Sequence, residues 1–144
     1  MDICVGKVED FYSAPQGRLH YQKDGVDIIV LRHKGEMFAM DSFCYHAGGP
    51  LYKGDIEDIG DYSCIVCPWH KYKVTLQTGK NLYQSVDPYN MKKAPVWTCG
   101  KVKQRTHQVI IRGNDVYVRV TSCTGELDSD HYNSAEFKAK YKLT

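Results

Sequence analysis

Long apolar runs are absent from this sequence. No stretch approaches the roughly 20 consecutive apolar residues that a helix needs to span a bilayer. Residues 1–13 carry several charged side chains and lack the apolar segment of about 7–15 residues that marks a secretory signal peptide. We therefore expect a cytoplasmic protein without a membrane span.

An excess of charge of either sign is also absent. Nineteen lysines and arginines stand against 17 aspartates and glutamates, so the formal net charge is only +2. A protein that binds nucleic acid or an anionic membrane surface usually presents a strongly basic stripe, and we expect neither kind of partner. The 144 residues suffice for one domain with its own core.

The sequence gives little support for a disulfide framework. Its six cysteines are spread over 144 residues, whereas disulfide-rich scaffolds are typically short secreted chains. In a reducing compartment, cysteines serve metal binding or redox chemistry instead. Four cysteines stand outside any motif, and we interpret them as ordinary free thiols: Cys4, Cys64, Cys99 and Cys123.

The patterns that are present indicate mainly β-structure. Branched and apolar side chains, separated by turn residues, predict strands at residues 26–32, 37–40, 62–66, 71–76, 108–112 and 115–120. Residues 83–93 are predicted to be irregular, and Pro95 bars a central strand there. We therefore predict an all-β, antiparallel domain with a small loop-rich lobe between residues 42 and 80.

The last part of the chain differs in composition from the rest. Residues 122–144 are more polar than the rest and read as a C-terminal extension of a domain that covers residues 1–121. Within this extension, the spacing of Ser134 and Glu136 predicts a short helix that begins with a capping box.

Two short motifs combine cysteine with histidine. Cys44 and His46 form a C-x-H motif, and Cys67 and His70 form a C-x₂-H motif after twenty intervening residues. Structural zinc sites usually place a cysteine pair ahead of a histidine pair, whereas here each loop supplies one sulfur and one nitrogen. This order suits two metal atoms side by side, one held by sulfur and one by nitrogen, as in a Rieske centre. A zinc-stabilised module stays open as the alternative.

The sequence resembles the Rieske family, and most closely the small stand-alone Rieske domain-containing proteins of animals. The segments CYHAGGPL at 44–51 and CPWHKY at 67–72 carry the resemblance. It implies a β-sandwich of Rieske type over residues 1–121, with residues 42–80 as the cluster-binding lobe. It also implies one [2Fe–2S] cluster per chain, with Cys44 and Cys67 on the buried iron and His46 and His70 on the outer iron.

The resemblance implies a soluble, ferredoxin-like electron carrier rather than an enzyme. Its expected donor is a reductase, of the flavoprotein kind, and its expected acceptor is a protein such as an oxygenase. Rieske oxygenases also need a second domain whose mononuclear iron is held by two histidines and a carboxylate. The 24 residues after Val120 contain a single histidine, His131. A small electron-transfer subunit of an oxygenase complex and a redox-sensing module remain as alternatives.

The resemblance also bears on the reduction potential. High-potential members carry a serine and a tyrosine after the second ligand loop, where this chain has Tyr72 and Val74, and a disulfide where it has Gly49 and Trp69. Both differences predict a potential in the lower part of the Rieske range, which spans about −150 to +300 mV.

Several further features carry weaker expectations. Asp55, Glu57, Asp58 and Asp61 read as a solvated turn or a docking surface for a basic partner, and residues 93–97 as a loop that covers the cluster. Surface positions are expected for a second group of side chains: Lys92, Lys93, Lys101, Lys103, Arg105, His20, His33, His107 and His131.

Overall fold

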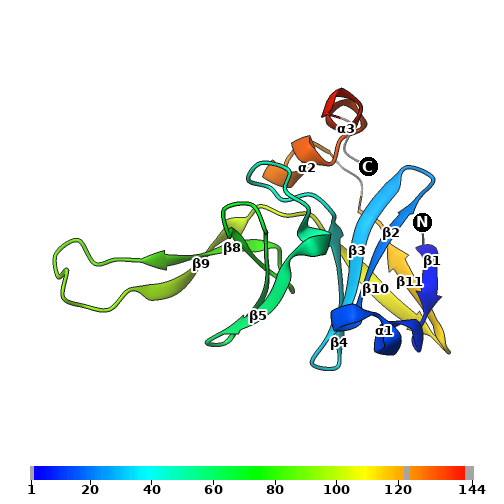
Figure 1. The fold of residues 1–144 in the computed structure, drawn as a ribbon, viewed down its shortest axis with the longest axis horizontal. Helices are drawn as coiled ribbons and strands as arrows, with labels where there is room; N and C mark the ends of the chain where they lie inside the picture. Colours follow the sequence, from blue (N-terminus) through cyan, green and yellow to red (C-terminus); the bar gives the residue numbers. More distant parts are fainter. Residues whose placement is uncertain (1, 122–123, 142–144) are drawn as a thin grey trace.

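The computed structural model describes residues 2–121 and 124–141 and confirms the predicted antiparallel all-β fold. Two sheets are present among these residues (Figure 1). The first has six strands in the spatial order β1 (Asp2–Lys7), β11 (Asp115–Arg119), β10 (Thr106–Arg112), β4 (Glu36–Asp41), β3 (Val26–His33) and β2 (Arg18–Lys23). The second has five strands in chain order: β5 (Asp55–Ile59), β6 (Tyr62–Val66), β7 (Lys73–Thr75), β8 (Lys80–Ser85) and β9 (Val96–Val102).

Four of the predicted strands, at residues 26–32, 37–40, 108–112 and 115–120, form two hairpins in the six-stranded sheet. Strands β3 and β4 pair in register from Ile28 with Asp41 to His33 with Glu36. The turn between them places Lys34 and Gly35 at positive φ, at 51° and 79°. Positive φ at two consecutive residues gives the tight turn that matches the twist of a two-residue hairpin.

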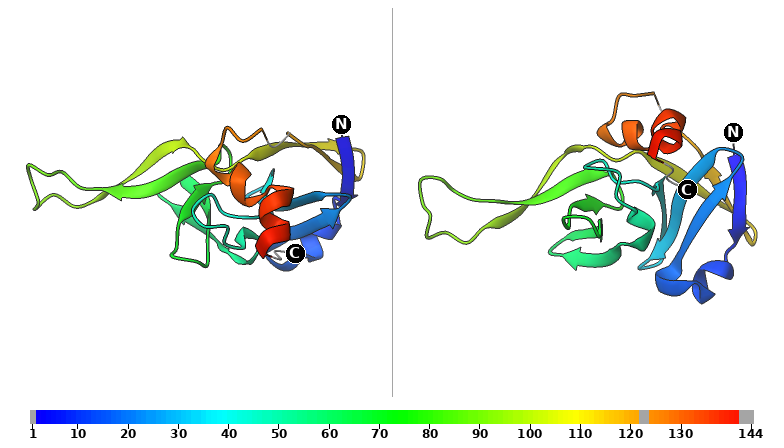
Figure 2. Two further views of the ribbon diagram at one scale, coloured as in Figure 1. Left: turned by 90° about the horizontal axis from the view of Figure 1, so that it is seen from above. Right: turned by 45° about the horizontal axis from the view of Figure 1, so that its top comes forward.

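The five-stranded sheet contains the main departures from the prediction. The acidic run is only partly a turn: Asp55, Glu57 and Asp58 lie in the edge strand β5 (Asp55–Ile59), whereas Asp61 lies in the turn that follows. Strand β8 extends to Ser85, into the segment that was expected to be irregular. Pro95 directly precedes β9, which is the opposite edge strand, so the missing N–H of proline disrupts no ladder. Together β8 and β9 form an arm that projects from the body of the molecule, with residues 86–95 at its tip (Figures 1 and 2).

The core explains how the two sheets are joined. The side chains of β3 alternate between its two faces, and both faces are buried: Ile28 and Val30 join one apolar cluster, whereas Ile29 and Leu31 join the other. This second cluster continues into the five-stranded sheet and includes both motif cysteines, with Ile29, Leu31, Met40, Cys44, Tyr45, Leu51, Ile65, Cys67, Val74 and Leu76 as its buried members. Burial of one such aliphatic side chain is worth about 1.5–3 kcal/mol.

Short helices complete the described chain. Near the N-terminus lie α1 (Asp10–Ser13) and the 3₁₀ turn η1 (Pro15–Gly17), and the turn η2 (Leu51–Lys53) follows the first motif. Near the C-terminus, α2 (Asp128–Tyr132) and α3 (Ala135–Tyr141) lie over the end of the molecule that carries the loop after β4 (Figures 1 and 2). In the described residues, no helix has the length and apolar character that crossing a membrane would require.

The helix predicted near Ser134 is present as α3, but the capping box is wrong. The Ser134 hydroxyl accepts a hydrogen bond from the N–H of Phe137 at 3.2 Å, as an N-cap residue does. A capping box needs Glu or Gln at the third helical residue. That position holds Phe137, because Glu136 is only the second residue of the helix.

Candidate metal centre

The two Cys/His motifs lie in loops that close in the same way. In the loop after β4, the N–H of Cys44 donates to the carbonyl of Gly49 at 2.8 Å. In the loop between β6 and β7, the N–H of Cys67 donates to the carbonyl of Tyr72 at 2.8 Å. Each cysteine therefore begins a tight loop that ends five residues later, and the two loops are structural counterparts.

The two loops touch each other at Gly49. A Cβ atom on Gly49 would lie 2.4 Å from the Cys67 Sγ and 3.2 Å from the Trp69 Cβ. These distances show that the backbone of the first loop approaches the second so closely that only glycine fits. Gly49 and Trp69 are adjacent, as two residues joined by a disulfide must be. Neither residue carries a sulfur atom, so the disulfide of the high-potential members cannot form here.

Both motif cysteines are buried, with 0% of Cys44 and 1% of Cys67 exposed. The hydrogen bond from the Cys44 thiol lowers the pKa of Cys67 to about 7, and the same bond, together with burial, raises the pKa of Cys44. The two sulfur atoms are therefore close neighbours inside the core.

The motif histidines lie further out. The ring centroids of His46 and His70 are 5.6 Å apart, with their planes at 86°. His46 is half-buried and stacks on the ring of Tyr72, with 3.7 Å between centroids and 17° between planes, whereas His70 is exposed. The Nδ1 atom of His46 is buried and has no hydrogen-bond partner among the described residues. An unpaired buried polar atom costs about 1–3 kcal/mol, which a metal bound at this nitrogen would offset.

The four motif side chains form two pairs rather than one cage. Within residues 2–121 and 124–141, no three cysteine, histidine, aspartate or glutamate side chains gather as one metal ion would require. The donors instead combine two neighbouring buried sulfurs with two neighbouring outer imidazoles. This donor set fits a dinuclear group better than the single zinc ion of the alternative interpretation.

A buried glutamine, which the sequence analysis missed, supports the first loop. Gln104 is fully buried at 0% exposure. Its Oε1 accepts from the N–H of Tyr45 at 2.9 Å, and its Nε2 donates to the carbonyls of Asp41 and Phe43 at 3.0 and 2.9 Å. The sequence offered no signal for this role, because the contacts join positions about sixty residues apart.

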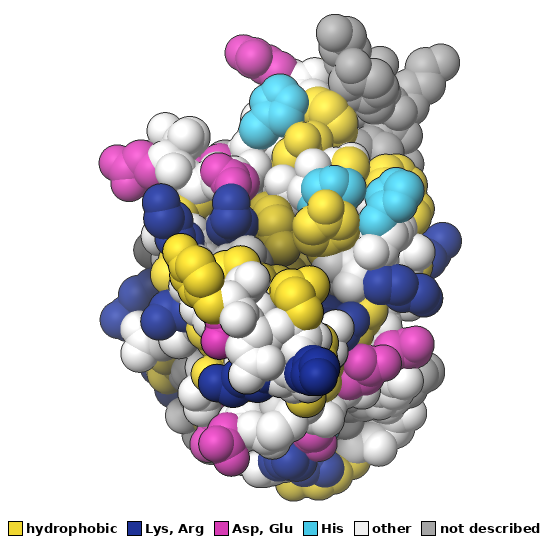
Figure 3. Space-filling view, turned by 90° about the vertical axis from the view of Figure 1, so that its left-hand side faces the viewer, with side chains coloured by type: hydrophobic (Ala, Val, Ile, Leu, Met, Phe, Trp, Pro, Cys, Tyr) yellow, Lys and Arg dark blue, Asp and Glu magenta, His cyan; other side chains and the backbone are white. Residues whose placement is uncertain are grey.

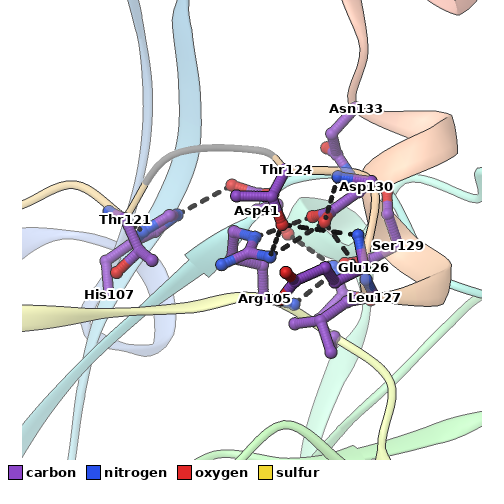
Figure 4. A network of polar contacts seen from close by, with 12 residues as sticks. Asp41, Arg105, His107, Thr121, Thr124, Glu126, Leu127, Ser129, Asp130 and Asn133 are labelled. Atoms are coloured by element: carbon purple, nitrogen blue, oxygen red, sulfur yellow. Dashed lines mark hydrogen bonds and ion pairs between the residues drawn. The ribbon is translucent and has the colours of Figure 1, made fainter.

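Two residues expected at the surface are in fact buried next to the same loop. The Nε2 of His107 lies 2.7 Å from a carboxylate oxygen of Asp41. The guanidinium of Arg105 donates to both carboxylate oxygens of Asp130, at 2.7 and 2.8 Å (Figure 4). The prediction that these two side chains lie at the surface is wrong, because each is buried against a carboxylate from a distant part of the chain.

Asp58 of the acidic run and the described cysteines outside the two motifs lie outside the candidate site. Asp58 accepts from Ser63, and His33 and Lys34 lie 2.9 and 3.1 Å from its carboxylate, which lowers its pKa below the usual range. Burial raises the pKa of Cys64 to about 11, so this residue is an inert buried thiol. Cys4 is exposed and Cys99 half-buried, while Cys123 lies outside the described residues.

The surface beside the two histidines is hollowed. A depression of about 670 Å³ is lined by aromatic and basic side chains of the second loop and the base of the arm, together with both motif histidines. Figure 3 shows histidine side chains beside apolar ones on this side of the molecule. Residues 93–97 were expected to cover the cluster. Of these, only Trp97 lines the depression, whereas Lys93, Ala94 and Pro95 are exposed residues of the arm.

Comparisons with known proteins agree with this geometry. A sequence model of the soluble Rieske-type ferredoxins matches residues 3–123. A human Rieske domain-containing protein is 43% identical over 136 residues, which cover 94% of this chain and 85% of the human protein. The ferredoxin subunit of a 3-phenylpropionate/cinnamic acid dioxygenase from Photorhabdus laumondii is 27% identical over 83% of this chain and 94% of its own.

Solved structures show the same fold. The ferredoxin of carbazole 1,9a-dioxygenase from Nocardioides aromaticivorans IC177 superposes with a TM-score of 0.60 at 20% identity, over 84% of this chain and 99% of its own. A chain from a complex of reduced oxygenase and oxidized ferredoxin in carbazole 1,9a-dioxygenase superposes with a TM-score of 0.58 at 21% identity, over 81% and 91%.

Proposed function

The chain belongs to the family of Rieske-type ferredoxins, and from this premise we propose that it carries single electrons between a reductase and an acceptor protein. A Rieske domain implies an iron–sulfur cluster. We propose that this cluster is of the [2Fe–2S] type, with one per chain. In this role the protein transfers electrons and does not itself transform a substrate.

One observation carries the proposal: two touching loops present a buried pair of sulfurs and an outer pair of imidazoles. Cys44 and Cys67 would hold the inner iron, and His46 and His70 the outer one. The unpartnered Nδ1 of His46 supports this assignment. When bound, the cluster supplies a centre that gains and loses one electron reversibly.

The surrounding residues favour that chemistry in three ways. Two thiolates and two neutral imidazoles bring less negative charge than four thiolates, which makes the addition of an electron easier. The buried cysteines keep water away from the inner side. Tyr72 stacks on His46 and fixes its ring, while exposed His70 leaves a short path for electrons to a docked protein.

The partners are proposed by analogy. A solved relative in fold forms a complex of reduced oxygenase with oxidized ferredoxin, and we propose an oxygenase as the acceptor and a flavoprotein reductase as the donor. We also propose a cytoplasmic location, where the free cysteines among the described residues would stay reduced.

The proposal is tested by an iron count and spectra of the freshly purified protein. We expect about two irons per chain, a red-brown colour, and a rhombic electron paramagnetic resonance signal after reduction with dithionite. Cys67→Ala and His70→Ala should lose or alter the cluster. Their matched controls, Cys64→Ala and His33→Ala, should retain it. A colourless, iron-free protein would refute the proposal, and one zinc ion per chain would support the structural module instead.

A further inference from the structure

The segment 124–141, which includes α2 and α3, packs on the first ligand loop. It lies beyond the residues that the ferredoxin family model matches, which end at 123. We propose that this segment, here called the C-terminal clamp, positions the first ligand loop and thereby controls how firmly His46 and Cys44 hold the cluster. The inference rests on the proposed function for its link to the cluster.

Asn133, which follows α2, makes the most direct contact. Its Oδ1 accepts from the N–H of Phe43 at 3.1 Å, and its Nδ2 donates to the carbonyl of Phe43 at 2.9 Å. The side-chain amide therefore satisfies both backbone groups of the residue before Cys44, as a neighbouring strand would. The Nδ2 also donates to the carbonyl of Ser129 at 2.7 Å, which fixes the amide to its own helix.

Tyr132 holds the other end of the motif. Its hydroxyl donates to the carbonyl of His46 at 3.1 Å. The rings of Tyr132 and Phe137 also pack on Gly48, where an added Cβ would lie 3.1 and 3.4 Å from their nearest atoms. The clamp thus contacts the first ligand loop at three residues: Phe43, His46 and Gly48.

The clamp is itself anchored to the connection between β9 and β10. The ion pair of Arg105 and Asp130 is bidentate and almost fully buried (Figure 4). The hydroxyl of Ser129 accepts from the N–H of Arg105 at 2.9 Å, and the N–H of Ser129 donates to the carbonyl of Lys103 at 2.9 Å. Charge-assisted, bidentate pairs of this kind are among the strongest and most directional contacts in proteins.

The same connection also carries Gln104, which binds Asp41, Phe43 and Tyr45, so the Phe43 carbonyl accepts from both Gln104 and Asn133. The backbone from Asp41 to His46 is therefore held by Gln104 and the clamp together. Outer contacts that orient metal ligands typically change metal affinity by about 10- to 100-fold when they are lost. The clamp would act on the cluster through these backbone groups, without contacting a metal.

The test uses two point variants of the full-length protein. Asn133→Ala removes both bonds to Phe43, and Tyr132→Phe removes only the hydroxyl that binds His46. We expect the amide of Phe43 to exchange hydrogen about two- to tenfold faster in Asn133→Ala. We also expect both variants to lose iron faster to bathophenanthroline disulfonate, and the reduced protein to show an altered paramagnetic resonance signal.

Matched controls separate positioning from general stability. Val118→Ala makes a cavity in the other core cluster, and Tyr117→Phe removes a hydroxyl in β11. Both should leave the rate of iron loss and the resonance signal unchanged, even where the melting temperature falls. If Asn133→Ala and Tyr132→Phe behave like these controls, the clamp does not position the loop. Amide exchange at Phe43 reports on the loop backbone directly, whereas the iron count tests the proposed function, so the two failures stay distinct.

Discussion

At the scale of single residues, Gly49 shows how tightly the site is built. The φ angle at Gly49 is not positive, so glycine is needed there for space rather than for conformation. Any Cβ would lie 2.4 Å from the Cys67 Sγ and 3.2 Å from the Trp69 Cβ, so the loops would have to move apart to admit it. The residue therefore sets the distance between the two ligand loops.

We predict that Gly49→Ala destabilises the fold by about 1–3 kcal/mol, the usual cost of overpacking, and lowers the iron content. The measurements are denaturant unfolding and iron per chain. Gly60→Ala serves as the control, because a Cβ there meets no atom within 4 Å although φ is 59°. It should cost about 1–2 kcal/mol through backbone strain and keep its iron. Full iron in Gly49→Ala would contradict the prediction.

The carboxylate of Asp130 gives a prediction about pH. Hydrogen bonds from Arg105 lower its pKa from 3.8 to about 2. A depressed pKa stabilises the fold above pH 3.8, and this stabilisation is lost as the pH falls toward 2, because the unfolded chain takes up the proton first. The difference corresponds to about 2 kcal/mol.

The free energy of unfolding of the unaltered protein should therefore decrease by about 2 kcal/mol more between pH 5 and pH 2 than that of Asp130→Asn. Urea titrations across this range provide the measurement. Asp128→Asn is the matched control, since Asp128 pairs with Lys103 at the surface, where ion pairs contribute about 0–1 kcal/mol. An identical pH profile for Asp130→Asn would show that the buried pair has no such role.

At the scale of elements, β7 and the loop that precedes it place two side chains, Tyr72 and Val74, beside the candidate metal centre. Tyr72 stacks on His46, and Val74 is a fully buried apolar residue in the core of β7. Hydrogen bonds to cluster sulfurs raise the potential of such centres, and the side chain of Val74 has no donor to offer.

We predict a midpoint potential below about +200 mV, in the lower part of the Rieske range. A redox titration followed by visible absorption measures it directly. A value above that limit would mean that other residues supply the hydrogen bonds that serine and tyrosine at these two positions supply in high-potential members. Tyr72→Phe, which keeps the aromatic stack, should shift the potential much less than Tyr72→Ala, which frees the His46 ring.

The elements also show where sequence reasoning succeeds and where it fails. Local signals were sufficient for the hairpin of β3 and β4, whose apolar runs flank the turn at Gly35, and for the two Cys/His loops. They were insufficient for β5, whose acidic side chains suit an exposed edge as well as a turn. The supports of the site depend on distant pairs: Asn133 binds Phe43 across 90 positions, and no local pattern encodes such a contact.

At the scale of the whole molecule, the site and the tip of the arm belong to separable parts. Residues 86–95 form the exposed tip of the arm, whereas the site depends on the core cluster that spans both sheets (Figure 1). None of the buried core residues comes from this tip.

Replacement of residues 86–95 by a two-residue Asn-Gly turn should therefore leave the iron content unchanged and alter the melting temperature by only a few degrees. Iron analysis and a thermal melt test this directly. A protein that folds but cannot retain iron would show that the arm supports the site. A parallel shortening of the η1 segment, residues 15–17, is the contrasting change, because η1 packs on the core strand β3.

The connection from Lys103 to Arg105 has a consequence for how such chains can diverge. Three consecutive residues serve different elements: Gln104 reaches the first ligand loop, while Lys103 and Arg105 bind α2. One inserted or deleted residue would move at least one of these side chains away from its partner, because the three contacts are made by consecutive positions of a three-residue connection. We therefore expect natural length variation to avoid these three positions, even though they lie between two strands where insertions are ordinarily tolerated.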